Sequence, residues 1–243
     1  MNIKKIIIKN KYHKFYPLLN NYFYGSNGIY KIKTNSNGFR THEFTKRKYK
    51  KNYLFLGDSF IAPDNISNNE SFINLYEENK KDVILYNLGV DGTGTDQQLN
   101  IFEEYGRKIH FDELVICVNP ENIFRNLRKE IQFKINSNHV INFAKDYYSL
   151  KKNKLVFNEN IKNQNKYSKF QKLKISKINH NLKKYLSIKN YYLLRRFFGK
   201  DTFSIYNSNS YEWLLMKKIL LEFRKKTNKK INIILIPHPE HYF

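Results

Sequence analysis

Three short apolar runs recur in the first half of the chain, each closed by small or polar residues and followed by a helical pattern. Apolar runs of this length that end in a turn signal predict buried strands. The runs follow one another at about 30 residues, the length of a βαβ unit. An α/β fold with parallel strands is therefore expected, with the carboxyl ends of the strands meeting at one crevice. The pattern predicts strands at 53–57, 83–88 and 113–118, followed by helices at 69–80, 95–108 and 121–129.

The C-terminal part of the sequence continues the same alternation. Residues 208–227 have the spacing of a long amphipathic helix, and the apolar run at 231–236 predicts a further buried strand. Together with the preceding units, these elements predict one α/β domain over 51–243. The side chains expected to face inward from the helix are Trp213, Leu214, Ile219, Leu220 and Phe223.

Two segments stand outside this alternation. Residues 1–50 form a basic lead-in that we expect to pack on the domain, and residues from about 130 to 206 form an insertion. The second half of the insertion, 166–198, is basic and helical in pattern, with lysines between aromatic residues. We expect this pattern to reflect packing on the domain or lining of a substrate cleft first, contact with an anionic membrane second and nucleic acid third. Short strands are predicted at 28–34, 139–143 and 154–157.

The first apolar run ends in the tripeptide Gly57-Asp58-Ser59. A serine at the tip of such a strand lies where α/β folds place their chemistry. Gly57 permits a sharp turn, and the amides at the start of a following helix stabilise negative charge. The alternative is an ordinary strand-to-helix turn in which Ser59 is only a helix cap.

Residues 57–60, Gly-Asp-Ser-Phe, and residues 87–92, Asn-Leu-Gly-Val-Asp-Gly, together resemble the first two sequence blocks of the SGNH hydrolase family, also called the GDSL esterase/lipase family. The segment Asn-Ser-Asn-Gly-Phe-Arg at 35–40 resembles the lead-in of many bacterial members. The resemblance implies a three-layer α/β/α sandwich with a mainly parallel, flavodoxin-like sheet. It also implies that Ser59 is the nucleophile of an ester hydrolase or acyltransferase and that the backbone N–H of Gly92 lies in the oxyanion hole.

The third block of the family, Gly-x-Asn-Asp, is altered here to Asn119-Pro120-Glu121-Asn122. In the family the asparagine side chain donates to the oxyanion. By resemblance the donor is Asn122, with Asn119 as the alternative, because the chemistry needs only an amide N–H about 3 Å from the oxyanion. An equally weighted interpretation is that both asparagines form a turn and cap the next helix.

The last block of the family, Asp-x-x-His, is absent from the sequence. In the family its histidine is the general base that takes the serine proton, and its aspartate orients the histidine. His238, Glu240 and His241 follow the last predicted strand. Three interpretations stay open: a truncated chain, an inactive relative, or a substitute pair in which His238 or His241 acts with Glu240, with His241 as the named candidate base. The first two are favoured, because a terminal tail is poorly ordered unless it is tied down.

The formal net charge of +23 is typical of proteins that bind nucleic acid or anionic surfaces. The lysines, however, are spread along a chain that is also rich in Asn, Ile and Tyr, the composition expected from an AT-rich genome. No nucleic-acid-binding motif accompanies them. We therefore attribute the charge to genome composition and expect no nucleic-acid partner.

Cofactor and metal sites are not predicted. The glycine-rich segment 91–95 lacks the ending of a phosphate-binding loop, and His238 and His241 have no third ligand beside them in the sequence. Cys117 is the single cysteine, so an intramolecular disulfide is excluded. Its position inside an apolar run predicts a buried apolar residue.

Location and function follow from these observations as expectations. No run reaches the roughly 20 apolar residues that span a bilayer, and the N-terminal run is too short for a signal peptide, so a cytoplasmic location is the default, with peripheral membrane contact left open. The predicted function is an SGNH-type serine esterase acting on acyl esters, foremost O-acetyl groups of glycans, and truncated or impaired by the missing Asp-x-x-His. The alternative is an inactive relative that binds glycan or another polyanion. Neither interpretation defines an oligomeric state.

Overall fold

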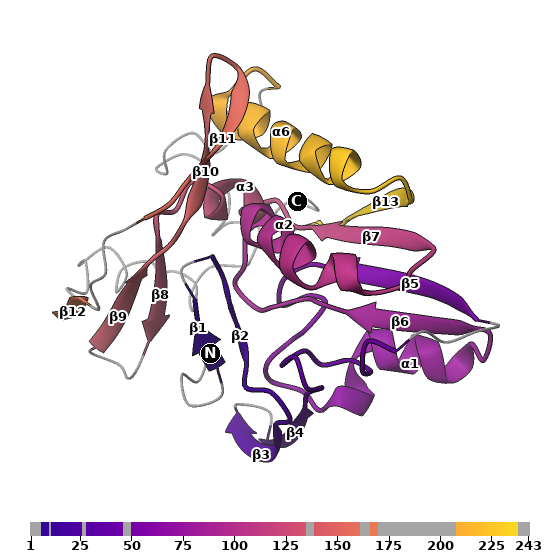
Figure 1. The fold of residues 1–243 in the computed structure, drawn as a ribbon. Coiled ribbons are helices and arrows are strands. Elements are labelled where there is room, and N and C mark those ends of the chain that lie inside the picture. The colour runs from indigo at the N-terminus through magenta and orange to yellow at the C-terminus, as the bar shows by residue number, and fades with distance from the viewer. Residues whose placement is uncertain are drawn as a thin grey trace, which may run out of the picture.

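The computed structural model describes residues 6–9, 11–25, 28–45, 50–134, 139–160, 166–169 and 208–237. Its centre is a four-stranded parallel sheet in the order β13-β7-β5-β6 (Figure 1). Numbered by their order in the chain and read from β6 to β13, the strands have the order 2-1-3-4, which is the first four places of the doubly wound order 2-1-3-4-5. The prediction of an α/β fold with parallel strands is confirmed. The strands are β5 (Lys51–Leu56), β6 (Val83–Asn87), β7 (Glu113–Val118) and β13 (Lys230–Leu235).

Helices alternate with these strands along the chain, as the sequence pattern predicts. They are α1 (Phe72–Asn79), α2 (Thr95–Glu104), α3 (Glu121–Arg125) and α6 (Tyr211–Lys226), with short 3-10 turns η2 (Asn68–Glu70) before α1 and η3 (Gly106–Lys108) after α2. The predicted helix at 69–80 is therefore divided into η2 and α1, and the one at 95–108 into α2 and η3.

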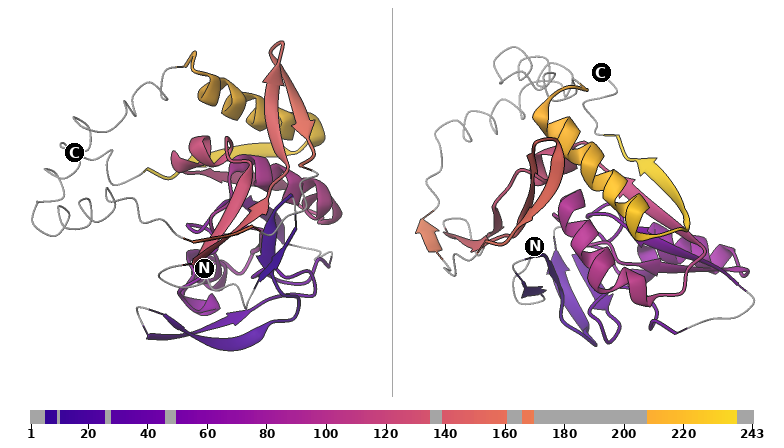
Figure 2. Two further views of the ribbon diagram at one scale, coloured as in Figure 1. Left: turned by 90° about the vertical axis from the view of Figure 1, so that its left-hand side faces the viewer. Right: turned by 45° about the horizontal axis from the view of Figure 1, so that its top comes forward.

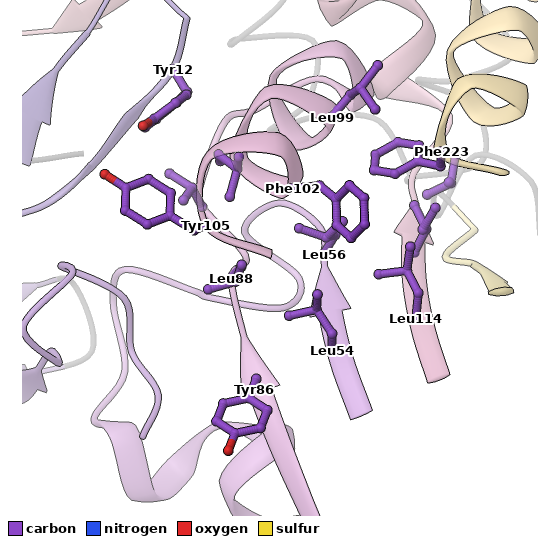
Figure 3. Packing of buried hydrophobic residues seen from close by; sticks show 14 of the residues in the cluster. Tyr12, Leu54, Leu56, Tyr86, Leu88, Leu99, Phe102, Tyr105, Leu114 and Phe223 are labelled. Atoms are coloured by element: carbon purple, nitrogen blue, oxygen red, sulfur yellow. The ribbon is translucent and has the colours of Figure 1, made fainter. Parts of the chain in front are cut away.

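Side chains alternate across the sheet, so each strand contributes to two apolar clusters. Leu54 and Leu56 point toward α2 and α6, where Phe102 and Phe223 lie with ring centroids 5.7 Å apart (Figure 3). Phe55, between the two leucines, faces the opposite side and packs in a smaller cluster with Ile73 of α1 and with Cys117. Cys117 is buried there, as the sequence predicts.

The buried stripe of α6 is rotated from the predicted one. Leu215, Met216, Ile219 and Phe223 are buried, whereas Trp213 is 37% exposed. Leu215, Ile219 and Phe223 recur at four-residue spacing and define the face toward the sheet, and Trp213 falls at the margin of that face. The prediction that Trp213 faces inward is wrong. The large apolar side chain of Trp213 in the first turn shifted the centre of the predicted buried face toward it.

Strand β13 is present where predicted, but it is not a buried strand. Ile233, Ile234 and Leu235 are 49%, 45% and 73% exposed. Among the described residues β13 pairs only with β7 and so forms an edge of the sheet. The length of an apolar run does not distinguish an edge strand from a central one, which is why the sequence pattern misled.

Small antiparallel sheets lie outside the central sheet (Figure 2). The N-terminal ones are β1 (Ile6–Ile8) with β2 (His13–Phe15), and the hairpin of β3 (Asn20–Gly25) with β4 (Gly28–Lys33). The others are β8 (Glu130–Lys134), β9 (His139–Ala144) and β12 (Lys166–Lys169), and the hairpin of β10 (Tyr147–Lys151) with β11 (Lys154–Asn158).

The three short strands predicted outside the main alternation are confirmed as β4, β9 and β11. The predicted helix over 166–198 is wrong for its first four residues, which form β12 against β9, because pairing with a neighbouring strand overrides local helical pattern. Residues 170–198 lie outside the described part of the chain. Within the described ranges, no helix is both long and apolar enough to cross a bilayer.

We expect the α6 stripe to dominate the stability of the helix layer. Replacing fully buried Ile219 with alanine should lower the free energy of unfolding by about 2–5 kcal/mol, because lost burial and the cavity add together. The matched control is Leu221→Ala in the same helix; Leu221 is 47% exposed, so its loss should cost about 0.5 kcal/mol or less. Urea denaturation of both variants measures the difference, and equal losses would contradict this packing.

Candidate active site

Four of the predicted site residues follow strands of the central sheet at the same end. Ser59 follows β5, Gly92 follows β6, and Asn119 and Asn122 follow β7. The chain leaves β5 toward β6 on one side and then crosses to β7 on the other, so β5 and β7 flank the topological switch point (Figure 1). Ligand sites in doubly wound folds lie in the crevice outside such a point.

Asp58 is fully buried at this end of the sheet and joins two of the loops. Its carboxylate accepts hydrogen bonds from Nη1 of Arg125 at 2.7 Å, from Nδ2 of Asn122 at 3.1 Å and from the N–H of Phe60 at 3.1 Å. The Arg125 side chain is itself only 13% exposed. A charge removed from water in this way is tolerated because an opposite charge and further donors surround it.

Asn122 is the hub between all three loops. Its Nδ2 donates to Asp58 and, at 3.1 Å, to the carbonyl of Thr93, while its oxygen accepts the N–H of Asn119 at 2.8 Å. An amide NH₂ has two donors, so both are already bonded to the protein. In this arrangement Asn122 positions loops, and its part as an oxyanion donor stays a prediction.

Asn119 is buried and makes the turn at the start of α3. Its side-chain oxygen accepts the N–H of Glu121 at 2.9 Å, two residues on, which is the geometry of an Asx turn. Its Nδ2 donates to the carbonyl of Ile236 at 3.3 Å. The turn interpretation of this segment is thus observed, and Asn119 also ties α3 to the residue after β13.

Arg125 was not singled out from the sequence, although a signal was present. It lies three residues after Asn122, so both side chains share one face of α3. Beyond the ion pair with Asp58, its Nη1 lies 3.4 Å from the carbonyl of Thr93 and its Nη2 lies 2.7 Å from Oε2 of Glu121. Arg125 therefore brings a positive charge to this end of the sheet.

Ser59 is partly exposed and lies near the carboxylate of Asp91, whose pKa it lowers. Asp91 lies in the loop after β6, directly before Gly92, and was also missed from the sequence. Burial raises the pKa of Asp91 above its ordinary value, with the neighbouring Asp64 adding to the effect and Arg125 and Ser59 opposing it. The site thus pairs a hydroxyl with a carboxylate of increased basicity.

Gly92 has a φ of +74°, in the left-handed region that favours glycine. It is exposed, and a Cβ added to it would meet nothing within 4 Å, so open space lies before this part of the loop. Glycine is needed here for its backbone conformation rather than for lack of room.

His13 reaches the site from β2, in the lead-in that the sequence analysis left without a role. It is buried, and its Nε2 lies 2.7 Å from the carbonyl oxygen of Asp91. Because a carbonyl only accepts, Nε2 is the donor. Burial lowers the pKa of His13 to about 4, so the ring is neutral at neutral pH and acts as a support for the loop.

A second buried ion pair lies behind the first. Nζ of Lys145 is 2.6 Å from Oδ2 of Asp96 at the start of α2, and it donates to the carbonyl of Arg125 at 3.0 Å. Both side chains are 1% exposed. Lys145 lies between β9 and β10, so this contact fastens the segment after α3 to the helices that carry the site.

His238, Glu240 and His241 lie outside the described residues. Among the residues that are described, no group of three or more His, Cys, Asp or Glu side chains is placed to hold a metal ion. Burial raises the pKa of Cys117 to about 12, so its thiol is a poor nucleophile.

Comparison with known proteins adds no family. No family model matches the chain, and no curated protein matches it. The likeness to SGNH hydrolases therefore depends on the residues and spacings of the chain itself.

We expect Asn122 to stabilise the fold. Asn122→Ala should lower the free energy of unfolding by about 1–3 kcal/mol, because it removes one of the two donors to the carbonyl of Thr93 and one donor to the buried Asp58 carboxylate. Asn79→Ala at the exposed end of α1 is the control and should cost about 0.5 kcal/mol or less. Unchanged stability of Asn122→Ala in thermal denaturation would refute its role as a hub.

The Lys145–Asp96 pair gives a second test of the same region. Lys145→Met should cost about 3–5 kcal/mol, because it leaves a buried carboxylate without its counter-charge. The double variant Lys145→Met/Asp96→Asn should lose less than the two single variants added together. A double-mutant cycle by urea denaturation measures this coupling, and strict additivity would show that the pair contributes nothing as a pair.

Proposed function

We propose that this protein is a serine hydrolase of the SGNH type that acts on acyl esters. The observation that carries the proposal is the position of Ser59, which follows β5 at the switch point of the sheet and is partly exposed. Doubly wound folds place their ligand sites at this point, and an accessible hydroxyl there can act as a nucleophile once a base activates it.

The backbone around Ser59 supports the same proposal. The N–H groups of Ser59 and Gly92 have no acceptor among the described residues, and the loop at Gly92 faces open space. Both N–H groups are thus available to an oxyanion. Removing one donor of this kind typically costs about 2.7–4 kcal/mol of transition-state stabilisation.

In the proposed reaction the oxygen of Ser59 attacks the ester carbonyl while its proton passes to a base. The N–H groups of Ser59 and Gly92 stabilise the negative oxygen that forms. The leaving alcohol departs with a proton, and water then hydrolyses the acyl-serine. The base implied by the family resemblance is a histidine, and His241, with His238 and Glu240 beside it, stays a prediction.

The wider architecture belongs to the same proposal. The apolar clusters on the two faces of the sheet suit a three-layer α/β/α sandwich with a flavodoxin-like sheet, into which residues from about 130 to 206 are inserted. Substrates would be small or glycan-borne acyl esters, foremost O-acetyl groups, either hydrolysed or transferred. This substrate class is proposed from the family resemblance. The cytoplasmic location is proposed from the sequence alone.

One observation favours an alternative, a non-catalytic relative that binds glycan or another polyanion. Both amide donors of Asn122 are bonded to Asp58 and Thr93 in the described arrangement, so the side chain expected to complete the oxyanion hole is already used. A crevice with Arg125 at its edge, in a chain with a net charge of +23, would suit an anionic ligand.

Labelling with a fluorophosphonate probe distinguishes these functions. We expect the wild-type protein to be labelled at Ser59 and Ser59→Ala to be unlabelled. The matched control is Ser36→Ala: the Ser36 hydroxyl donates to the carboxylate of Glu43 at 2.5 Å, but Ser36 is exposed and follows no strand of the central sheet. Ser36→Ala should be labelled like the wild type.

Mass spectrometry of the labelled peptide identifies the modified serine. Absence of labelling in folded wild-type protein would refute the hydrolase and favour the binding function, as would equal labelling of wild type and Ser59→Ala.

A further inference from the structure

One face of the hairpin formed by β3 and β4 packs on the protein. Phe23 stacks there on Tyr30, with ring centroids 5.9 Å apart, and Tyr30 and Ile32 are buried in one apolar cluster with Ile6 and Phe15. The hairpin lies at the margin of the molecule, on the side opposite α6 (Figure 1).

The other face of the hairpin is exposed and largely apolar. Cross-strand partners share a face, so Tyr22 with Lys31, Tyr24 with Ile29, and Lys33 lie together on this outer face. Tyr22, Tyr24 and Ile29 are 66%, 85% and 62% exposed. Nζ of Lys31 lies 5.1 Å from the centre of the Tyr22 ring, a cation–π contact. Neighbouring apolar side chains left in water in this way mark a surface for a partner.

Leu18 adds a second observation directly before β3. Its φ of +53° lies in the left-handed region, which is uncommon for a bulky residue, and Leu18 is 71% exposed. A hydrogen bond from its N–H to the carbonyl of Asn35 at 3.0 Å holds this part of the chain. Because an exposed side chain adds little to the core, an unfavourable backbone conformation at this residue points to a function outside the core.

The N-terminal part of the chain carries positive formal charge only. Residues 1–42 contain seven lysines and one arginine but no aspartate or glutamate. Lys31 and Lys33 of the outer face belong to this stretch. Glu70 of the neighbouring η2 is bonded through Oε2 to the N–H of Ser67 at 2.6 Å. The outer face is therefore complementary to a surface of negative charge.

We propose that the outer face docks on an anionic membrane surface. Tyrosine is enriched where a membrane meets water, because its ring is apolar and its hydroxyl is polar. Lysines near such a surface are attracted to anionic lipid headgroups, and aliphatic side chains such as Ile29 and Leu18 enter the boundary with the acyl chains. The inference goes beyond the proposed function and does not depend on the chemistry of Ser59.

Two other partners fit the outer face less well. A second copy of the chain in a symmetric contact would bring Lys31 and Lys33 against the same lysines, which repel. An acidic polysaccharide would satisfy the lysines and stack on the tyrosines, but its hydroxyl-rich surface offers no apolar environment to Ile29 and Leu18. An anionic membrane provides both the charge and the apolar layer.

The hairpin is held firmly, so docking would order little of the chain. The N–H of Lys33 donates to Oδ1 of Asn68 at 3.1 Å, and Nδ2 of Asn68 donates back to the carbonyl of Lys33 at 2.8 Å. The N–H of Lys31 donates to Oγ of Ser67 at 3.1 Å. Ser67 and Asn68 lie in the segment between Ser59 and α1, so a docked hairpin would hold this segment near the lipid.

Sedimentation with vesicles tests the charge of the outer face. The full chain should bind phosphatidylcholine vesicles that contain about 30% phosphatidylglycerol, bind pure phosphatidylcholine at least about tenfold more weakly, and lose affinity as salt is raised. Lys31→Gln/Lys33→Gln should weaken binding about 25-fold, because each lysine near the surface contributes about fivefold. The matched control is Lys151→Gln/Lys154→Gln, an exposed cross-strand pair of the β10–β11 hairpin, which should change binding by about twofold or less.

Ile29→Ala tests the apolar part of the outer face with the same vesicles. It should weaken binding about five- to tenfold, because three carbon atoms no longer enter the acyl boundary. Leu221→Ala is the matched control: Leu221 is 47% exposed on α6, on the opposite side of the molecule, and this variant should bind like the wild type.

Fluorescence gives a second readout, because Trp213 of α6 is the single tryptophan of the chain. In Tyr24→Trp/Trp213→Phe the only tryptophan lies on the outer face. Its emission should shift to the blue on anionic vesicles, as the ring leaves water. The emission of the wild type, from α6, should stay unchanged on the same vesicles.

Equal binding of the hairpin variants and their controls, or an unshifted emission from Tyr24→Trp/Trp213→Phe, would overturn the proposed docking. So would binding of dextran sulfate without binding of vesicles, which would favour a polysaccharide partner. Thermal denaturation checks the fold of each variant, and should Ile29→Ala fail to fold, the lysine variants and the fluorescence decide. Ser59→Ala should bind vesicles like the wild type, so a failure of the docking and a failure of the hydrolase are distinguishable.

Discussion

The buried carboxylate of Asp58 is the constraint on which the rest of the site depends. A negative charge at the end of a buried strand is costly to remove from water, and it is held there only because Arg125 and Asn122 converge on it. The same two side chains also reach the carbonyl of Thr93. One charged group therefore fixes the relative positions of loops that follow three different strands. The same group also positions Ser59, because Ser59 is the next residue in the chain.

The second ion pair extends this constraint outward. Lys145 bonds both Asp96 of α2 and the carbonyl of Arg125, so the segment between β9 and β10 supports the residue that neutralises Asp58. The hairpin β10–β11 continues from there along α6, where the N–H of Leu150 donates to the Tyr211 hydroxyl at 3.2 Å (Figure 2). Polar contacts that look peripheral in the sequence thus hold the helix layer and the site together.

The sequence predicted the central fold well because buried parallel strands are nearly continuous apolar runs closed by turns. It misjudged β13 and Trp213, since exposure depends on which neighbours cover an element and not on the element itself. The site was predicted only in part. Ser59 and Gly92 were named because they belong to recognisable motifs, but Asp91 and Arg125 gain their roles from contacts between loops about 30 to 70 residues apart, which no local pattern records. His13 was the hardest of these residues to predict, because it lies in the N-terminal lead-in, far along the chain from the Asp91 carbonyl that it contacts.

The burial of His13 beside the Asp91 loop makes the stability of the protein sensitive to mild acid. An unfolded chain protonates this histidine near pH 6.5, whereas the folded chain resists until about pH 4, because the buried ring is kept neutral. The stabilisation is complete above the unfolded pKa and is lost as the pH falls toward the folded pKa. Over this window the difference amounts to about 3 kcal/mol, seen as a falling free energy of unfolding that His13→Gln would largely abolish. Acidification would thus destabilise the whole fold through one buried ring, because the unfolded chain takes up a proton that the folded chain excludes.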